Sequence, residues 1–238
     1  PKMSGESWFI GNQSQQSLKE KIEQIGKPLK EWDVNIYYGI KTGLNEAFII
    51  DQKTRDRLIT EDPNSADILK PILRGRDIKR YSYDWAGLWL IASGFDINIP
   101  ILYPSVFHHL EKFKEKAIKR DDKGKNWWNL RACSYYDEFN GEKIIYPNMT
   151  KYLPFIYDSD GFFTNQKCFI LTAKSCLKYL TGYFNSSIAQ RWIRNNCPEL
   201  QGGTRELSKI FFANIPIPPI TEINQPMVDQ IENLVEKI

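Results

Sequence analysis

The chain carries five short segments that combine cationic side chains with amide or hydroxyl side chains. Lys and Arg neutralise the phosphates of nucleic acid, whereas Arg, Asn, Gln, Ser and Thr can hydrogen-bond to base edges. This combination is the chemistry of a nucleic-acid contact surface, although each segment taken alone also fits a solvated loop. The candidate contacts are Lys41, Thr42 and Asn45; Arg74, Arg76, Lys79 and Arg80; Lys119, Arg120, Lys123, Lys125, Trp127 and Arg131; Asn165 and Lys167; and Arg205.

Two adjacent tryptophans, Trp127 and Trp128, lie within the third segment. An exposed indole ring can stack on a base or insert between two bases. The alternative is structural, with one ring buried and the other partly exposed. Gly43 and Gly75 have a similar structural alternative, because glycine supplies the positive φ that tight turns require.

Catalytic and metal-binding patterns are missing from the sequence. It contains neither a phosphate-binding G-x-x-x-x-G-K-[ST] loop nor a G-x-S-x-G nucleophile turn. Its two histidines are adjacent and its four cysteines form no C-x-x-C pair, so a structural zinc site is not expected. Asp51-Gln52-Lys53 and Asp121-Asp122-Lys123 match the short metal-nuclease pattern, but a chain with 26% charged residues contains such triplets by chance. We therefore assign no catalytic residue and no metal ligand.

Length, charge and composition limit the possible classes of protein. The 238 residues suffice for one large domain or two small ones. A net charge of +3 permits a local basic face without requiring one. The sequence has no apolar run of about 18 residues that would span a membrane, and residues 1–8 lack the apolar core of a signal peptide. We expect a cytoplasmic protein with reduced thiols, and the absence of Met at position 1 indicates an excised piece of a longer chain.

Apolar periodicity predicts both helices and strands. Helices are expected over residues 15–31, 54–60, 66–70, 104–120 and 221–238, and Ser65 is the expected N-cap of the third. Residues 175–193 are expected to contain helical segments with a cap at Asn185-Ser186-Ser187 between them. Runs of β-branched and aromatic residues predict strands over 34–40, 46–51, 89–92, 143–147, 155–157 and 168–171. A flexible loop is expected at 201–205, and proline geometry predicts an extended segment at 215–219.

These elements together predict a mixed α/β fold of the α+β kind. We expect short, partly antiparallel sheets with flanking helices and a C-terminal helix. Three parts are predicted: an N-terminal lead-in with a helix over residues 1–33, a main domain over 34–220, and the C-terminal helix over 221–238.

Several longer patterns run through the main domain. GIKTGLNEAFIID at 39–51 is followed by LITEDPNSADILKPILRGRDIKRY at 58–81. Further on come RDDKGKNWWNLR at 120–131, EKIIYP at 142–147, GGTR at 202–205 and IPIP at 215–218. This series resembles the specificity domain of TaqI-like and Eco57I-like restriction–modification enzymes, over roughly residues 15–222. Tyr183-Phe184 departs from it, because aliphatic residues are usual there.

The resemblance implies a function for the chain and for the protein around it. The chain is expected to be the target-recognition domain of a type IIG-like DNA adenine methyltransferase, which selects in double-stranded DNA the site for methylation, cleavage or both. Its expected partners are double-stranded DNA and N-terminal methyltransferase and endonuclease domains. The parent enzyme is expected to bind S-adenosylmethionine, and Mg for cleavage. No cofactor is expected in this chain. The sequence-reading contacts are expected mostly in the less patterned loops at 119–131 and 158–167.

The chain alone is not expected to be an enzyme. An adenine methyltransferase holds the flipped base with an N-P-P-Y-type motif, and the only Pro-Pro pair, Pro218-Pro219, lies in IPIPPI without that context. Two alternatives stay open. One is a protein-interaction module in which helices at 104–120 and 221–238 dock a partner. The other is an intact metal-dependent nuclease.

Overall fold

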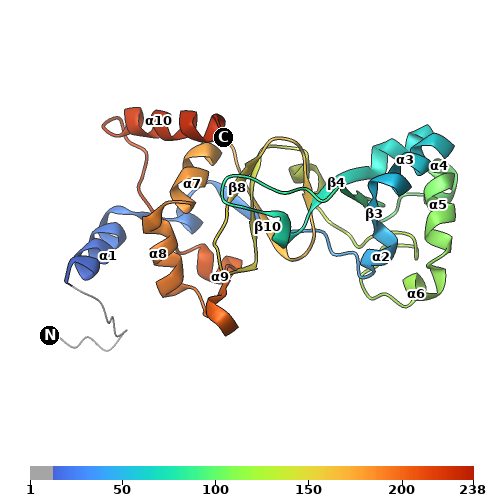
Figure 1. The fold of residues 1–238 in the computed structure, drawn as a ribbon, viewed down its shortest axis with the longest axis horizontal. Helices are drawn as coiled ribbons and strands as arrows, with labels where there is room; N and C mark the ends of the chain where they lie inside the picture. Colours follow the sequence, from blue (N-terminus) through green and yellow to red (C-terminus); the bar gives the residue numbers. More distant parts are fainter. Residues whose placement is uncertain (1–12) are drawn as a thin grey trace.

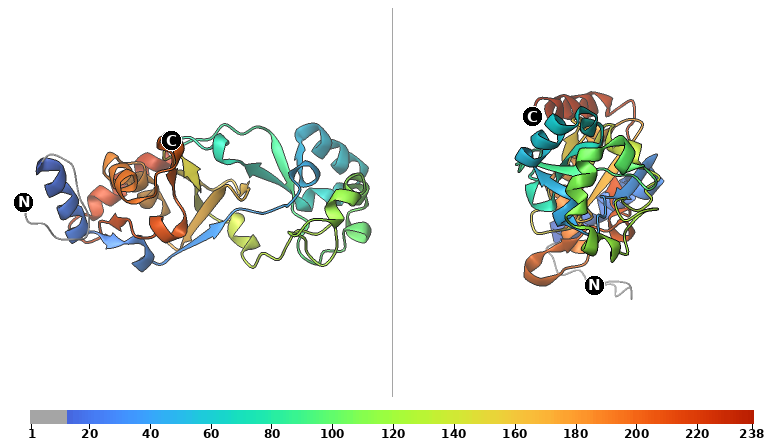
Figure 2. Two further views of the ribbon diagram at one scale, coloured as in Figure 1. Left: turned by 90° about the horizontal axis from the view of Figure 1, so that it is seen from below. Right: turned by 90° about the vertical axis from the view of Figure 1, so that its right-hand side faces the viewer.

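The computed structural model describes residues 13–238, which form an elongated molecule with two lobes placed end to end (Figure 1). The terminal lobe contains α1 (Gln13–Ile25), α7 (Leu177–Phe184), α8 (Ser187–Asn196), α9 (Lys209–Phe212) and α10 (Gln225–Glu236). The inserted lobe, built mostly from residues 45–139, contains α2 (Asn45–Phe48), α3 (Gln52–Glu61), α4 (Ile99–Leu102), α5 (Pro104–Glu111) and α6 (Lys114–Ile118). The left view of Figure 2 shows strands between these two groups of helices, and the right view looks onto the inserted lobe.

The sheet between the lobes is antiparallel and is buried on both faces. Its order is β2 (Val34–Tyr38), β10 (Cys168–Ala173), β6 (Lys143–Pro147) and β8 (Ile156–Asp158). Successive side chains of a strand point to opposite faces. Ile144 and Tyr146 accordingly join the core of the terminal lobe, whereas Ile145 joins the core of the inserted lobe. Burial on both faces explains why β6 and β10 are almost wholly apolar runs.

The inserted lobe has its own sheet, with helices packed around it. The order is β3 (Ile49–Asp51), β5 (Leu88–Ile91), β4 (Leu69–Leu73) and β9 (Phe163–Thr164), and only the β4–β9 pair is parallel. Phe48, Leu58 and Leu90 are fully buried in its core. Two short antiparallel pairs complete the strands of the described residues, β1 (Lys27–Pro28) with β12 (Pro216–Ile217) and β7 (Met149–Thr150) with β11 (Arg205–Glu206).

The mixed α/β fold class predicted from the sequence is confirmed, as are most of the strands and several helices. The strands predicted at 89–92, 143–147, 155–157 and 168–171 correspond to β5, β6, β8 and β10. The helix predicted at 54–60 lies within α3, and that at 221–238 contains α10. Ser186 caps α8 by accepting a hydrogen bond from the backbone N–H of Ala189. The first twelve residues of the predicted lead-in lie outside the described residues.

The helix predicted over 104–120 is wrong, because the structure divides it into α5 and α6. Phe113, between the two helices, has φ −111° and ψ 7°. Its ring packs against the core and lies 5.5 Å from the His109 ring. The half-buried Phe113 side chain thus packs against the core at the bend between the two helices. Within the described residues no helix is long and apolar enough to cross a membrane.

Four other boundaries also differ from the prediction. The helix expected to 31 ends at Ile25, because Gly26 and Pro28 disfavour its continuation and Lys27–Pro28 instead pair with β12. The strand expected at 46–51 begins with the helical turn α2, since the Ala47 N–H donates to the Leu44 carbonyl. In place of the helix predicted at 66–70, the structure has a 3-10 helix over Pro63–Ile68, whose cap is Asp62, while Ser65 is buried. In place of the flexible loop predicted at 201–205, it has a 3-10 turn followed by strand β11.

Candidate nucleic-acid interface

The first and fourth predicted segments run side by side where the two lobes meet, joined by a parallel bridge between Ile40 and Asn165. The Ile40 N–H donates to the Thr164 carbonyl at 2.7 Å, and the Gly39 N–H donates to the Cys168 carbonyl at 3.0 Å. A Cβ atom on Gly39 would lie only 2.0 Å from the carbonyl oxygen of Asn165. This close approach of the two backbones therefore depends on glycine at position 39.

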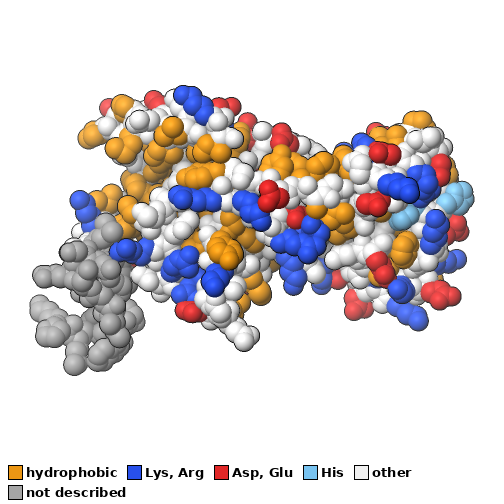
Figure 3. Space-filling model, in the orientation of Figure 1, with side chains coloured by type: hydrophobic (Ala, Val, Ile, Leu, Met, Phe, Trp, Pro, Cys, Tyr) orange, Lys and Arg blue, Asp and Glu red, His pale blue; other side chains and the backbone are white. Residues whose placement is uncertain are grey.

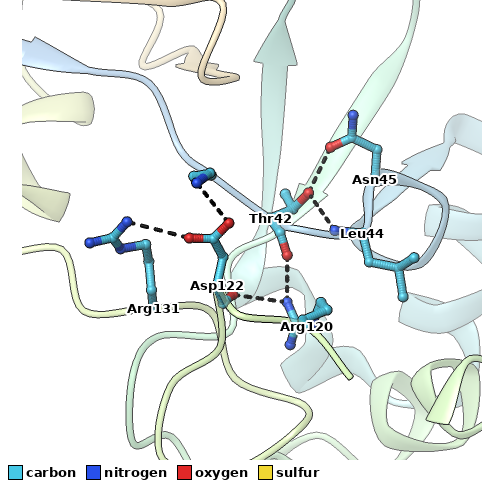
Figure 4. Close-up of polar contacts among 7 residues, drawn as sticks. Thr42, Leu44, Asn45, Arg120, Asp122 and Arg131 are labelled. Atoms are coloured by element: carbon cyan, nitrogen blue, oxygen red, sulfur yellow. Dashed lines mark hydrogen bonds and ion pairs between the residues drawn. The ribbon is translucent and has the colours of Figure 1, made fainter. Parts of the chain in front are cut away.

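The second and third segments join the same place. Asp122 accepts from Lys41 at 2.9 Å and from Arg131 at 3.4 Å, and Figure 4 shows the Asp122 and Arg131 side chains pointing toward one another. On the other side, a Cβ atom on Gly75 would lie 3.7 Å from the Lys167 carbonyl oxygen. Four of the five predicted segments thus meet at the junction of the lobes.

Arg120 is not a surface contact, which corrects its assignment as a candidate. Its side chain is buried and lies over the Phe48 ring, 4.3 Å from the centroid. The guanidinium donates to the carbonyl oxygens of Thr42, Trp127 and Asn129 at 2.5, 2.7 and 2.9 Å (Figure 4 shows the first of these). Burial lowers the pKa of Arg120 to about 10. Arg120 is a framework residue that ties two loops together.

Thr42 is also unavailable to a ligand, because its side chain is buried. Its hydroxyl donates to Oδ1 of Asn45 at 2.6 Å and accepts from the Leu44 N–H at 3.2 Å. Figure 4 shows these bonds closing the turn after Lys41. Thr42 therefore shapes the loop, while Asn45 and Lys41 remain exposed.

Arg74 and Arg76 have different environments although both belong to one cationic turn. Arg74 makes a bidentate pair with the buried carboxylate of Asp77, with Nε–Oδ2 at 2.9 Å and an Nη–Oδ1 distance of 2.8 Å. These hydrogen bonds to Asp77 raise the pKa of Arg74. Arg76 is exposed and has no side-chain hydrogen bond or ion pair within residues 13–238. Arg76 is the cation that this turn presents to solvent.

The other cations of these segments are mostly exposed. The Lys79 ammonium donates to the Arg76 carbonyl at 3.0 Å, and Arg80 donates to the Asn185 carbonyl at 2.8 Å. Lys123 donates to the Arg120 carbonyl at 2.8 Å. A further set is exposed to solvent, namely Lys119, Lys125 and Lys167. Asn165 is half-buried, and its Oδ1 accepts from the Lys167 N–H.

The two tryptophans pack together rather than presenting a free ring. Their centroids are 5.4 Å apart, and both rings also contact Phe107. Trp127 and Trp128 are each half-buried against the core of the inserted lobe. Only part of the Trp127 ring is therefore accessible, which leaves little surface for stacking on a base.

The fifth predicted segment lies further along the terminal lobe. Arg205 pairs with Glu199 at 2.6 Å and donates to the Arg194 carbonyl at 3.0 Å. Two exposed cations next to Arg205, Lys151 and Arg194, were not predicted from the sequence. The Arg194 side chain donates a hydrogen bond to the Lys151 carbonyl at 3.2 Å. The only sequence signal was the spacing of Arg191 and Arg194 on one face of an amphipathic helix.

A chain of backbone contacts connects these segments. The Asn148 N–H donates to the Lys167 carbonyl at 2.8 Å, and the strand that follows Asn148 pairs with the strand that begins at Arg205. Figure 3 shows Lys and Arg side chains spread across the middle of one face of the molecule. We define the basic strip as the exposed cations along this path, Arg131, Lys41, Lys167, Arg76, Lys151 and Arg194.

A cavity of about 440 Å³ opens at the junction, beside the basic strip. Its wall contains Tyr38, Lys41, Arg131 and Gln166. Across the part of the chain that the structure describes, no group of three or more His, Cys, Asp or Glu side chains is placed to hold a metal ion. The side chains that line this cavity include cations, an amide, tyrosine rings, a thiol and a hydroxyl.

Fold and surface together define a mixed α/β domain whose loops present a basic strip. The chain belongs to the family of TaqI-like C-terminal specificity domains, whose model matches residues 70–217. It is similar to the type II methyltransferase M.XhoI of Xanthomonas vasicola, at 19% identity over 230 residues and 93% of this chain.

Two solved structures share the fold. One is the type IIL restriction–modification enzyme MmeI in complex with DNA, with a TM-score of 0.65 and 16% identity over 88% of this chain. The other is the type IIG restriction endonuclease BpuSI, with a TM-score of 0.57 and 14% identity over 95% of this chain. The chain spans 41% of the length of M.XhoI and 28% of each solved chain. It thus matches only part of each larger protein.

Proposed function

We propose that this chain is the target-recognition domain of a type IIG-like restriction–modification enzyme and selects a sequence in double-stranded DNA. The observation that carries the proposal is the convergence of four sequence-distant loops at the junction of the lobes, where they contribute four cations to the basic strip. Membership of a specificity-domain family supports it, as does the fold shared with an enzyme whose structure was determined with DNA. In this role the domain positions DNA for a catalytic domain.

The exposed side chains divide into two roles on DNA. Lys and Arg of the basic strip neutralise phosphates and fix the register of the duplex, without carrying sequence information. The exposed amide of Gln166 has the donor and acceptor pair that distinguishes base edges. Asn45 is also exposed and offers its amide N–H groups, because its Oδ1 accepts from Thr42. The loops at 119–131 and 158–167 supply the remaining candidates for sequence reading.

Catalysis and cofactors belong to the parent protein in this proposal. Methyl transfer from S-adenosylmethionine and any Mg-dependent cleavage require domains outside this chain, which are its partners together with DNA. The modest net charge of +3 implies weak DNA affinity for the isolated domain. A neighbouring catalytic domain supplies the opposite wall of the DNA-binding cleft.

A second candidate, a protein-docking module, has one specific observation in its favour. Met227, Leu234 and Ile238 are exposed on and after α10, and a groove of about 390 Å³ lies between α7 and α10. Exposed apolar patches of this kind are found at protein–protein contacts. This surface is distinct from the basic strip, so docking through α10 and DNA binding through the strip are compatible in one domain.

Binding of duplex DNA as a function of salt tests the primary proposal. Fluorescence anisotropy of a labelled duplex is measured over a range of salt concentrations with the 238-residue chain. We expect the logarithm of the affinity to fall linearly with the logarithm of the salt concentration. Absence of binding at low salt, or binding that does not respond to salt, would contradict a role of the basic strip and favour the docking module.

A further inference from the structure

The cavity at the junction of the lobes includes three kinds of side chain in its lining. They are aromatic rings, cations and an amide, contributed by Tyr38, Tyr135, Lys41, Arg131 and Gln166. Its volume of about 440 Å³ falls within the usual range of small-ligand sites. The hydrogen bond from the Ile40 N–H to the Thr164 carbonyl joins two of the chain segments that line the cavity.

The tyrosines provide ordered planar surfaces. Tyr38 ends the edge strand β2, and its side chain is 53% exposed while its ring rests on Phe169, with centroids 4.4 Å apart. Tyr135 stacks on Tyr37 at 4.6 Å with an interplanar angle of 17°. A flat ligand can therefore stack on the cavity wall without first ordering these rings. Stacking on aromatic side chains is the sequence-tolerant way in which proteins hold unpaired bases.

The charges on the wall favour an anion. Lys41 and Arg131 share the single carboxylate of Asp122, at 2.9 and 3.4 Å. Two cations facing one anion leave one net positive charge, and both cations remain about half exposed. Gln166 is exposed and has no side-chain hydrogen bond within the described residues. A phosphate group matches the cations, and a base edge matches the free amide.

We propose that this cavity binds one unstacked nucleotide, with its base against Tyr38, its phosphate at Lys41 and Arg131, and its base edge at Gln166. The inference rests on the proposed function and deepens it, because it places one nucleotide of the bound DNA outside the base stack. The same chemistry is shared by a free mononucleotide. Nucleotides within DNA and free nucleotides are therefore tested in separate arms.

Two cysteines allow a direct footprint of the cavity. Cys133 lines it and Cys176 does not. Both thiols are half-buried and free, and burial raises the pKa of each. Alkylation by iodoacetamide is followed peptide by peptide by mass spectrometry, at about pH 9 to raise the thiolate fraction. Cys176 then reports any change in reactivity that is unrelated to the cavity.

The probes are the four deoxynucleoside 5′-monophosphates, with deoxyribose 5-phosphate as the control without a base. We expect a saturating monophosphate to slow Cys133 alkylation about tenfold and to leave Cys176 unchanged. The control sugar phosphate should have no such effect. In the DNA arm, a duplex with one bulged nucleotide is compared with its fully paired counterpart. Stronger protection by the bulged duplex identifies DNA as the source, whereas protection by monophosphates alone identifies free nucleotides.

Variants separate stacking from general effects. Tyr38→Ala is expected to weaken monophosphate binding about tenfold, because base–aromatic stacking is lost. Gln166→Ala provides a second, exposed position that should weaken binding and alter the preference among the four bases. The matched control is Tyr152→Ala, since Tyr152 is 78% exposed and does not line the cavity. Thermal melting confirms that each variant is folded.

The outcomes distinguish this inference from the proposed function. Equal rates of Cys133 alkylation with and without every nucleotide probe would overturn the nucleotide site, even if paired duplex still binds in anisotropy. Protection that persists in Tyr38→Ala and Gln166→Ala would also overturn it. Conversely, protection by monophosphates without any duplex binding would contradict the proposed function and leave the nucleotide site standing.

Discussion

Gly39 passes so close to Asn165 that a Cβ atom on Gly39 would lie 2.0 Å from the Asn165 carbonyl oxygen. The two residues are distant in the sequence, yet their contact sets the relative position of the first and fourth loops of the interface. The approach is tolerated only because glycine has no side chain.

Gly39→Ala is therefore expected to separate these loops. We expect a loss of stability of about 2 kcal/mol or more, since backbone atoms must move to relieve the overlap, together with weaker DNA binding. Urea denaturation and duplex anisotropy measure the two effects. Gly141→Ala is the matched control, because nothing lies within 4 Å of a Cβ atom there. Equal stability of both variants would contradict the close approach.

The buried pair of Lys143 and Asp158 supports the second prediction. Their Nζ–Oδ2 distance is 2.5 Å and both side chains are fully buried. Lys143 also donates to the Phe139 carbonyl, while Asp158 accepts from the Phe162 N–H. Lys143→Met should cost about 3–5 kcal/mol of unfolding free energy, because it leaves a carboxylate buried without its counter-charge.

The control for this pair is an exposed one. Lys174 lies 3.6 Å from Asp33, and both side chains are largely exposed, so Lys174→Met should leave the urea midpoint unchanged. A Lys143→Met variant as stable as the parent chain would show that the pair does not hold the turn at 158–162.

The third prediction separates cations that contact DNA from cations that hold the fold. Arg76→Ala with Lys167→Ala should lower DNA affinity and reduce the salt slope by about 1.8, which is the value for two phosphate contacts. Its melting curve should match that of the parent chain, because both side chains are exposed. The control removes two charges elsewhere, Lys53 on α3 and Lys237 at the end of α10. The double variant Lys53→Ala with Lys237→Ala should leave the salt slope of DNA binding unchanged.

Arg74→Ala is predicted to behave differently from Arg76→Ala, although the two residues are neighbours in one turn. Loss of the bidentate pair leaves the buried Asp77 carboxylate without its cation. We expect a destabilisation of about 2–3 kcal/mol. A stable Arg74→Ala variant with weakened DNA binding would place Arg74 among the contact residues and contradict its structural role.

The fifth prediction concerns catalysis. The chain alone should transfer no methyl group from radiolabelled S-adenosylmethionine to DNA and should not nick plasmid DNA in the presence of Mg. Joining it to the catalytic domains of a parent enzyme should restore activity at a defined site. Incorporation of label or nicking by the purified chain would show that a catalytic centre resides in it.

The sequence by itself determined the fold class and most strands. The apolar runs at 143–147 and 168–171 predict buried strands, and the structure shows why they lack alternation: one sheet serves the cores of both lobes. The patterns at 39–51 and 58–81 indicate the family correctly, because turn glycines and core residues are local features of the chain. The prediction of one helix over 104–120 is wrong because the packing of Phe113 against the core, at the bend between α5 and α6, depends on tertiary contacts.

Only the tertiary structure decided which cations face solvent. Arg120 and Lys119 are neighbours in one charged segment, but Arg120 is buried against a loop that lies 78 residues earlier. Arg74 and Arg76 are likewise equivalent in the sequence, and a buried carboxylate separates their roles. The surface from Lys167 to Arg194 also exists only through strand pairing distant in sequence. A side chain's type sets what it can bind, whereas its exposure depends on long-range neighbours that local patterns do not encode.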